Sequence, residues 1–160
     1  MSGIVQAATL ATALGSGLVS GVWFTFSAFV MPALDRLPAA QGAAAMQSIN
    51  RLAVTAPLMV AMFGTALACL GLGVWAVVSL DGAAAWWVLG GGAVYVLGTI
   101  VVTRAGNVPL NNALEQLPPD SQAATELWAR YVRDWTAWNH VRLASSLGAA
   151  ALLTIALTVA

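Results

Sequence analysis

The segment AAAWWVLGGGAVYVLGTIVVT, residues 83–103, contains no charged side chain and is long enough to cross a lipid bilayer. A transmembrane α-helix needs about 20 consecutive apolar residues. Three further stretches meet this requirement, at residues 5–30, 54–80 and 138–159. The sequence therefore predicts an all-α integral membrane protein that forms a four-helix bundle.

The composition supports a single membrane domain over residues 1–160. Of the 160 residues, 60% are hydrophobic and only 8% are charged, whereas a soluble domain is about 25% charged. Outside the four spans lie two connections, at residues 31–53 and 104–137, and a tight turn at Asp81-Gly82. The first span follows no positive charge and is too long for a signal peptide, so we expect a retained helix. Cys69, the single cysteine, has no intrachain disulfide partner.

The basic residues predict the orientation of the bundle. With four spans, the two connections share one side of the membrane, and both termini share the other. All basic side chains lie in or beside the two connections, at Arg36, Arg51, Arg104, Arg130, Arg133 and Arg142. The positive-inside rule then places both connections in the cytoplasm and both termini outside, as expected for a bacterial inner membrane. Trp75, Trp86 and Trp87 cluster near the opposite end, as an interfacial aromatic belt would.

Local signals predict packing and helix ends. Small residues that let helices approach closely in lipid are the pairs Gly17/Gly21 and Gly64/Ala68, then Gly90, Gly91 and Gly92, and Ser145, Gly148 and Ala149. Pro38 suits a first helical turn, so a short interfacial helix is expected in the first connection. Pro109 predicts a break after the third span, with Val108 extended, and then a second short helix that runs to Leu117 and ends at Pro118-Pro119. Asp120 is expected to cap a long helix that continues into the fourth span.

Candidate site residues gather on that last helix. Trp135, Trp138, Asn139 and Arg142 follow the i, i+3, i+4, i+7 spacing of one helical face. His140 lies about 100° away around the axis. An arginine and a histidine at the mouth of a span are costly unless they have partners or water. The candidate partners are Asp35, Asp134, Asn107, Asn111 and Asn112.

Each of these residues also has a purely structural interpretation. In this interpretation Asn107 only caps the next helix, and Asn111 and Asn112 are solvated surface residues. The tryptophans can form a second interfacial belt, and Arg130 and Arg133 can contact lipid phosphates. Phe24, Phe26 and Phe29 on the first span fit core packing, whereas Trp23 and Thr25 of the same span are placed to reach the site.

Several chemistries lack their motifs. The chain has one histidine and one cysteine, so a dedicated zinc or copper site is not expected. Neither a phosphate-binding Walker loop nor a dinucleotide glycine fingerprint is present, and nothing predicts nucleic-acid binding. We therefore expect no cofactor. Haem ligated through His140 alone is the alternative that these residues leave open.

Four motifs together resemble the DUF1772 or anthrone-oxygenase-like family of small four-span membrane proteins. They are Gly21-Val-Trp-Phe-Thr-Phe-Ser-Ala-Phe-Val-Met-Pro32, Met46-Gln-Ser-Ile-Asn50, Asn107-Val-Pro-Leu-Asn-Asn112 and Trp135-Thr-Ala-Trp-Asn-His-Val-Arg142. Each motif alone is weak evidence for the family, but the four occur in the family's order, and the resemblance covers nearly the whole chain. The resemblance implies an O2-dependent monooxygenase that oxidises anthrones to anthraquinones, with no established cofactor.

If that activity applies, the site residues take defined roles. His140 is predicted to be the general base, and Arg142, Asn107 and Asn111 would hold the developing oxyanion. Trp135 and Trp138 would stack on an aromatic small molecule that arrives from the lipid bilayer. The remaining predicted substrate-binding residues are Asn139, Asn112, Trp23 and Thr25.

Two other functions remain open at this point. One is a small haem- or quinone-binding membrane protein that uses His140. The other is a non-catalytic subunit that packs against a larger membrane partner. The glycine-bearing helix faces also leave a homo-oligomer open.

Overall fold

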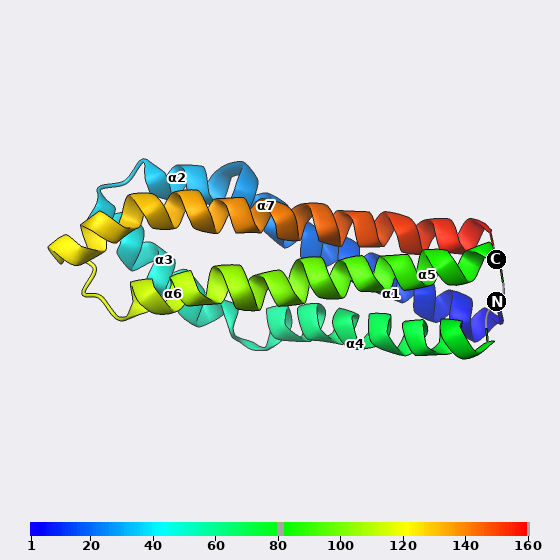
Figure 1. Ribbon diagram of the computed structural model, residues 1–160. Helices are drawn as coiled ribbons and strands as arrows, with labels where there is room; N and C mark the ends of the chain where they lie inside the picture. The colour runs from blue at the N-terminus through cyan, green and yellow to red at the C-terminus, as the bar shows by residue number, and fades with distance from the viewer. Residues whose placement is uncertain (80–81, 160) are drawn as a thin grey trace.

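The computed structural model describes residues 1–79 and 82–159, and every secondary-structure element within them is helical. The first rod combines α1 (Gly3–Thr25), the π-helical η1 (Phe26–Val30) and α2 (Met31–Asp35). Next come α3 (Ala39–Ala53) and α4 (Ala56–Ser79). The third rod joins α5 (Ala83–Tyr95), η2 (Val96–Val101), η3 (Thr103–Asn107) and α6 (Val108–Glu115), and α7 (Gln122–Thr158) follows. Figure 1 shows these elements as an elongated four-helix bundle, which confirms the predicted fold class.

Four helical segments are long and apolar enough to cross a membrane, which makes the chain an integral membrane protein. Three of them, at 33, 33 and 37 residues, measure about 50 Å or more at 1.5 Å per residue. A bilayer's hydrocarbon core is about 30 Å thick. The long helices therefore extend well beyond the apolar layer.

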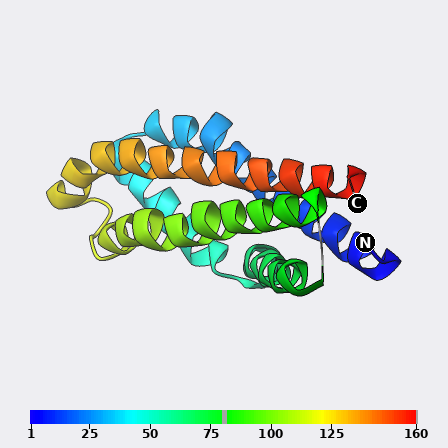
Figure 2. The same cartoon turned by 45° about the vertical axis from the view of Figure 1, so that its right-hand side comes forward.

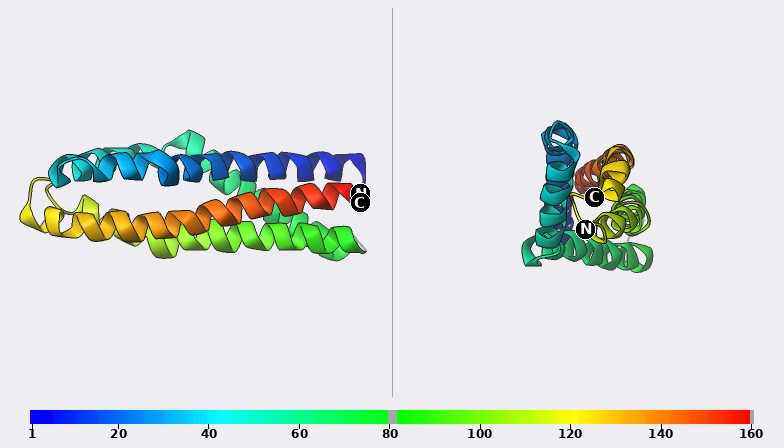
Figure 3. Two further views of the ribbon diagram at one scale, coloured as in Figure 1. Left: turned by 90° about the horizontal axis from the view of Figure 1, so that it is seen from above. Right: turned by 90° about the vertical axis from the view of Figure 1, so that its left-hand side faces the viewer.

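The helix α4 is shorter and occupies only one half of the bundle. Figures 1 and 2 show α4 in the half that holds both termini, with α3 lying across the other half. Seen from above in Figure 3, α7 lies between the rod that begins with α1 and the rod that begins with α5. We call the half of the bundle opposite the two termini the polar half, because it contains the arginines. In this half α3 occupies the position beside the other helices that α4 does not reach.

Two predicted helix ends are wrong. The third rod does not break at Pro109, and Val108 has helical angles, with φ −60° and ψ −43°. Pro109 follows the π-helical turn η3 and stands at the start of α6. The wider turn changes the hydrogen-bond register ahead of the proline, so its missing N–H and bulky ring do not interrupt the rod. At α7 the cap is Ser121, whose Oγ accepts from the Ala124 amide at 3.1 Å, instead of Asp120.

The glycines that pack helices together are only partly the predicted ones. A Cβ added at Gly17, Gly21 or Gly64 would meet nothing within 4 Å. By contrast, a Cβ at Gly91 would lie 2.9 Å from Leu153 Cγ, and at Gly92 3.2 Å from the Cys69 carbonyl oxygen. The prediction is therefore confirmed for these two glycines of α5 and wrong for Gly17, Gly21 and Gly64. Further glycines in close contact with other helices are Gly15, Gly42, Gly98 and Gly106. The predicted turn at Asp81-Gly82 falls partly outside the described residues.

A buried side chain fastens α3 to the end of α6. The predicted helix in the first connection is confirmed as α3. Its Gln47 is 5% exposed, and its amide nitrogen donates to the carbonyl oxygens of Leu114 at 2.8 Å and Leu117 at 2.9 Å. Leu114 belongs to the last turn of α6, and Leu117 lies two residues beyond its end, where no helical N–H groups follow. The Leu114 carbonyl also accepts from the Leu117 amide at 3.3 Å. One side-chain amide thus completes the end of α6 and holds α3 in place.

Replacing Gln47 should loosen this closure. Gln47→Ala removes two hydrogen bonds and leaves the Leu117 carbonyl oxygen without the side-chain donor that it has now, so we expect the free energy of unfolding to fall by about 1–3 kcal/mol. Denaturant unfolding in detergent micelles, followed by far-UV circular dichroism, measures the change. Gln41→Ala is the matched control, because Gln41 lies on the same helix and is exposed. Equal stability of the two variants would show that Gln47 does not hold α3.

Candidate functional site

A partly enclosed cavity of about 190 Å³ lies beside α3, where the first turns of α4 meet the other three segments. We call it the Arg142 cavity. One part of its lining is polar, and the rest consists of aromatic, aliphatic and methionine side chains. Its lining comprises Trp23, Phe26, Met46, Ile49, Asn50, Ala53, Val54, Leu58, Met59, Met62, Phe63, Thr103, Val108, Asn111, Trp135 and Arg142.

The guanidinium of Arg142 is the only charged group in this lining. The residue is 3% exposed. Its Nη2 donates to Asn139 Oδ1 at 2.8 Å, and its Nη1 donates to Thr103 Oγ1 at 3.4 Å. The guanidinium carbon lies 3.9 Å from the ring centroid of Trp23 and 4.9 Å from that of Trp135. Two indole faces and two neutral oxygens therefore surround the cation.

No carboxylate balances this charge within the described residues. The ion pairs found there join Arg51 to Glu115, and Arg130 and Arg133 to Asp134, all at the surface. The Nε of Arg142 is buried and has no hydrogen-bond partner. Removing a cation from water without an anion costs several kcal/mol in a protein interior. A buried guanidinium that lines a cavity and has no carboxylate partner among the described residues is therefore suited to an anionic ligand.

Asn139 holds the arginine in position. It is completely buried, and its Nδ2 donates to the Trp23 carbonyl oxygen at 2.7 Å and to Ser27 Oγ at 2.7 Å. Its Oδ1 is then free to accept from Arg142. Ser27 belongs to the π-helical η1, and Thr103 on the other side belongs to η3. π-helical turns often occur at functional sites because they redirect side chains locally.

A second polar group of the cavity centres on Asn111 of α6. Its Oδ1 accepts from Trp135 Nε1 at 2.8 Å and from the Tyr131 hydroxyl at 2.8 Å. The Tyr131 hydroxyl in turn accepts from Asn50 Nδ2 at 3.3 Å. Three helices, α3, α6 and α7, contribute to this network. The Trp135 side chain therefore makes two polar contacts: its N–H donates to the Asn111 amide oxygen, and its ring face lies against the Arg142 cation.

Asn107 is buried behind Trp135. Its Nδ2 donates to the Trp135 carbonyl oxygen at 3.1 Å, and its Oδ1 has no partner. Its side chain makes no capping hydrogen bond to α6, so the purely capping interpretation is wrong. Asn107 connects η3 to α7 at the level of the cavity.

Four predicted site residues lie away from the cavity. Trp138 is 44% exposed, and its ring packs where a Cβ at Gly106 would lie 2.6 Å away. Asn112 is exposed in a neighbouring surface pocket. Thr25 Oγ1 donates to the Gly21 carbonyl oxygen of its own helix at 2.9 Å.

The fourth is His140, which faces the other side of α7. It is exposed and lines a surface groove of about 360 Å³. The groove lies between α2 and α7 and also contains Asp35, Arg133 and Thr136. No observation tests the predicted role of His140 as a base, but its position separates it from the Arg142 cavity.

Sequence reasoning missed several residues of the cavity. Asn50, Thr103 and Tyr131 take part in its polar contacts, and Met59, Met62 and Phe63 of α4 form its apolar wall. Asn50 stands in a motif that carried the family resemblance, so a signal for it existed. Tyr131 lies one turn before Trp135 on the same helical face. The α4 residues carry no signal, because any apolar span has such side chains.

A surface pocket of about 270 Å³ adjoins the cavity and shares Asn50, Val54, Val108 and Asn111 with it. It lies between α3 and α6. The Arg51–Glu115 ion pair, at 2.7 Å, joins these two helices beside the pocket. The cavity therefore adjoins a surface pocket whose lining is mostly polar or charged.

Comparison with known proteins identifies the family. The family model described as anthrone oxygenase matches residues 56–152, more than half of the chain. The matched region runs from the start of α4 to near the end of α7, so it contains Asn111, Trp135, Asn139 and Arg142. No curated protein and no solved structure matches the chain. With a matched region that includes the buried arginine and part of the cavity lining, this four-helix membrane protein belongs to the anthrone oxygenase family.

Proposed function

We propose that the protein oxidises a phenolic polycyclic substrate of the anthrone type with O2, and that the reaction takes place in the Arg142 cavity. The observation that carries this proposal is the buried guanidinium, which lacks a carboxylate partner and lies between two indole rings. Such a site suits a flat aromatic anion. The family match supports an oxygenase-like function for the region that contains it.

The proposed reaction needs only the substrate and O2. An anthrone tautomerises to a phenolic anthranol, which loses a proton to give an anion. The anion transfers one electron to O2, and the carbon radical and superoxide combine to form a C–O bond. Protonation gives a hydroperoxide, which loses water as its O–O bond breaks and the carbon becomes a ketone. One oxygen atom of O2 ends in the quinone and the other in water.

The cavity residues support the anionic step. Arg142 offers positive charge that is already in place when the substrate loses its proton, which lowers the energy of the oxyanion. Trp23 and Trp135 present ring faces to an aromatic ligand. The cavity is smaller than the roughly 300–1,000 Å³ of typical ligand sites. We therefore propose that the flexible side chains of Met46, Met59 and Met62 move when a three-ring substrate binds.

The proton of the substrate needs an acceptor. Among the described residues, the lining contains no carboxylate or imidazole. We propose that Arg142 makes the phenol acidic enough for water to accept the proton, with Asn111 as a further donor to the oxyanion. Asn107 then serves to position the turn that carries Trp135.

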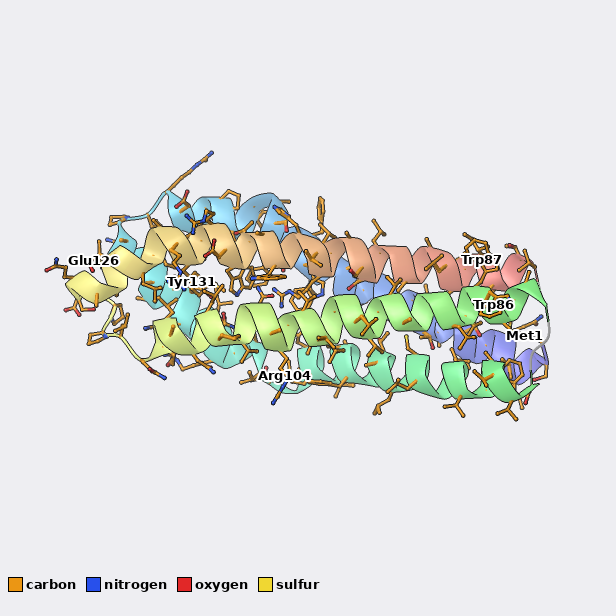
Figure 4. The ribbon with its side chains drawn as sticks, viewed as in Figure 1. Met1, Trp86, Trp87, Arg104, Glu126 and Tyr131 are labelled. Atoms are coloured by element: carbon orange, nitrogen blue, oxygen red, sulfur yellow. The ribbon has the colours of Figure 1, made fainter. Side chains whose placement is uncertain are left out.

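We further propose that the end with the cavity faces the cytoplasm and that both termini lie outside, as in a bacterial inner membrane. Figure 4 supports this arrangement, because Trp86, Trp87 and Met1 lie at the end opposite Glu126 and Tyr131. The arginines all belong to the half that contains the cavity. A substrate dissolved in the membrane would then reach a site at the edge of the apolar layer.

One observation favours a second candidate function. His140 lies in the groove between α2 and α7, close to Arg133, and such a site offers one axial ligand and one cation to a haem. An absorption spectrum and metal analysis of detergent-purified protein decide this point. The oxygenase proposal predicts no Soret band and no stoichiometric metal. A Soret band that disappears in His140→Ala would establish the haem-binding function instead.

Removing the buried charge should abolish most turnover. We expect Arg142→Gln to lower kcat/KM for O2 uptake with an anthrone by about 100-fold or more, because the oxyanion loses its main stabilising group. Arg142→Lys retains a cation and should lose less. Arg130→Gln is the matched control, since Arg130 is an exposed arginine of the same helix. Full turnover by Arg142→Gln would refute the proposed site.

His140 provides a separate test of the proton acceptor. Because its imidazole faces away from the Arg142 cavity, we expect His140→Ala to keep turnover within about threefold of the unchanged protein, less than the 10²–10⁴-fold that a general base contributes. The initial rate of O2 uptake across pH 5–9 measures this. A loss of 100-fold or more, together with a lost pH dependence, would show that His140 is the base.

A further inference from the structure

We propose that Tyr131, together with the Trp135 N–H, fixes the hydrogen-bonding direction of Asn50 and Asn111, so that one amide donor stands beside one amide acceptor in the lining of the Arg142 cavity. The matching ligand carries an acceptor oxygen and a hydroxyl donor along one edge, as a hydroxyaryl ketone does. Tyr131 is then a positioning residue that sets which substrates bind. The link to oxidation rests on the proposed function, but the binding preference does not.

The direction of Asn111 follows from Trp135. An indole N–H can only donate a hydrogen bond. Trp135 Nε1 lies 2.8 Å from the Asn111 side chain, so the atom that it meets must be the amide oxygen. The Tyr131 hydroxyl lies 2.8 Å from the same oxygen and must donate to it as well. The carbonyl side of Asn111 is therefore fully engaged with α7.

The direction of Asn50 follows from Tyr131. The hydroxyl has a single proton, and Asn111 takes it, so the Tyr131 oxygen is left to accept. Asn50 lies 3.3 Å from this oxygen and must turn its NH2 group toward it. No choice of amide orientation other than this one satisfies all three hydrogen bonds.

Two polar groups remain for a ligand. They are the NH2 of Asn111 and the carbonyl oxygen of Asn50, and neither has a hydrogen-bond partner among the described residues. Both residues line the Arg142 cavity and also the adjoining surface pocket. A donor from α6 and an acceptor from α3 are therefore available where the two spaces meet, in addition to the cation from α7.

Tyr131 is held too firmly to reverse this pattern. It is completely buried. Its ring stacks on Trp128, with centroids 5.6 Å apart and planes at 10°, and on Trp135 at 6.4 Å and 21°. Figure 4 shows Tyr131 on α7 near the polar end of the bundle, where α3 and α6 lie close by. A rigid aromatic stack therefore aims one hydroxyl between two asparagines of other helices.

The experiment compares two stable probes, 1,8-dihydroxyanthraquinone and unsubstituted anthraquinone. Quenching of tryptophan fluorescence in the detergent-solubilised protein gives both dissociation constants, because Trp23 and Trp135 line the cavity. We expect the protein to prefer the dihydroxy probe. Tyr131→Phe should reduce this preference by about tenfold, the effect of losing roughly one hydrogen bond. Anthraquinone binding should change little.

Tyr95→Phe is the matched control. Tyr95 is also completely buried, and its hydroxyl donates to the Met62 carbonyl oxygen at 3.1 Å, away from both asparagines. It should lose stability and keep the preference. An unchanged preference in folded Tyr131→Phe, or an equal loss in Tyr95→Phe, would overturn the proposal.

A second variant, Asn111→Leu, tests the same hydrogen-bond network independently of whether Tyr131→Phe folds. Asn111→Leu should lose the same preference, and adding Tyr131→Phe to it should cause no further loss, because both act through one amide. Independent, additive losses would contradict a positioning role. If Tyr131→Phe does not fold, an unchanged preference in Asn111→Leu overturns the proposal alone. This experiment measures binding only, and the O2-uptake assay described above is a separate test. Selective binding together with no O2 uptake in that assay would refute the proposed function and leave this inference intact.

Discussion

The contact of the Arg142 guanidinium with Asn139 and two indole rings is the interaction on which the rest of the polar half depends. A buried cation is tolerated only where its N–H groups find acceptors and its face finds polarisable neighbours. Asn139 provides the acceptor because its own amide is held by α1 and η1. Thr103 provides another from η3. The charge therefore ties three of the four membrane segments together around one cavity.

Helix length explains why the cavity forms where it does. Three helical rods extend past the apolar layer, whereas α4 begins about half-way along the bundle. The gap is closed by α3, which Gln47 fastens to the end of α6. A short helix closes a bundle less completely than a full-length one. The space that remains is lined by Arg142, Asn50, Asn111 and the methionines Met46, Met59 and Met62.

Much of this arrangement was predictable, because helical periodicity is a local property. The spacing of Trp135, Asn139 and Arg142 identified the buried face of α7, and long uncharged stretches identified the four segments. Asn50 and Tyr131 were missed because their hydrogen bond joins residues far apart in the chain, and no spacing rule reports such a contact. The break expected at Pro109 was wrong because a π-helical turn ahead of it changes the local hydrogen-bond register. His140 adjoins Asn139 in sequence, yet one residue of helical rotation turns it to the outer groove.

The most direct measurement is photoaffinity labelling of the detergent-solubilised protein with a diazirine-bearing hydroxyanthraquinone, followed by peptide mapping. If an aromatic ligand binds beside Arg142, the label is expected on the C-terminal turns of α3 and the first turns of α4, at Met46, Met59 or Met62. Excess unlabelled 1,8-dihydroxyanthraquinone should suppress it. Suppressible labelling confined to α2 and the His140 side of α7 would place the ligand in the outer groove and contradict the account.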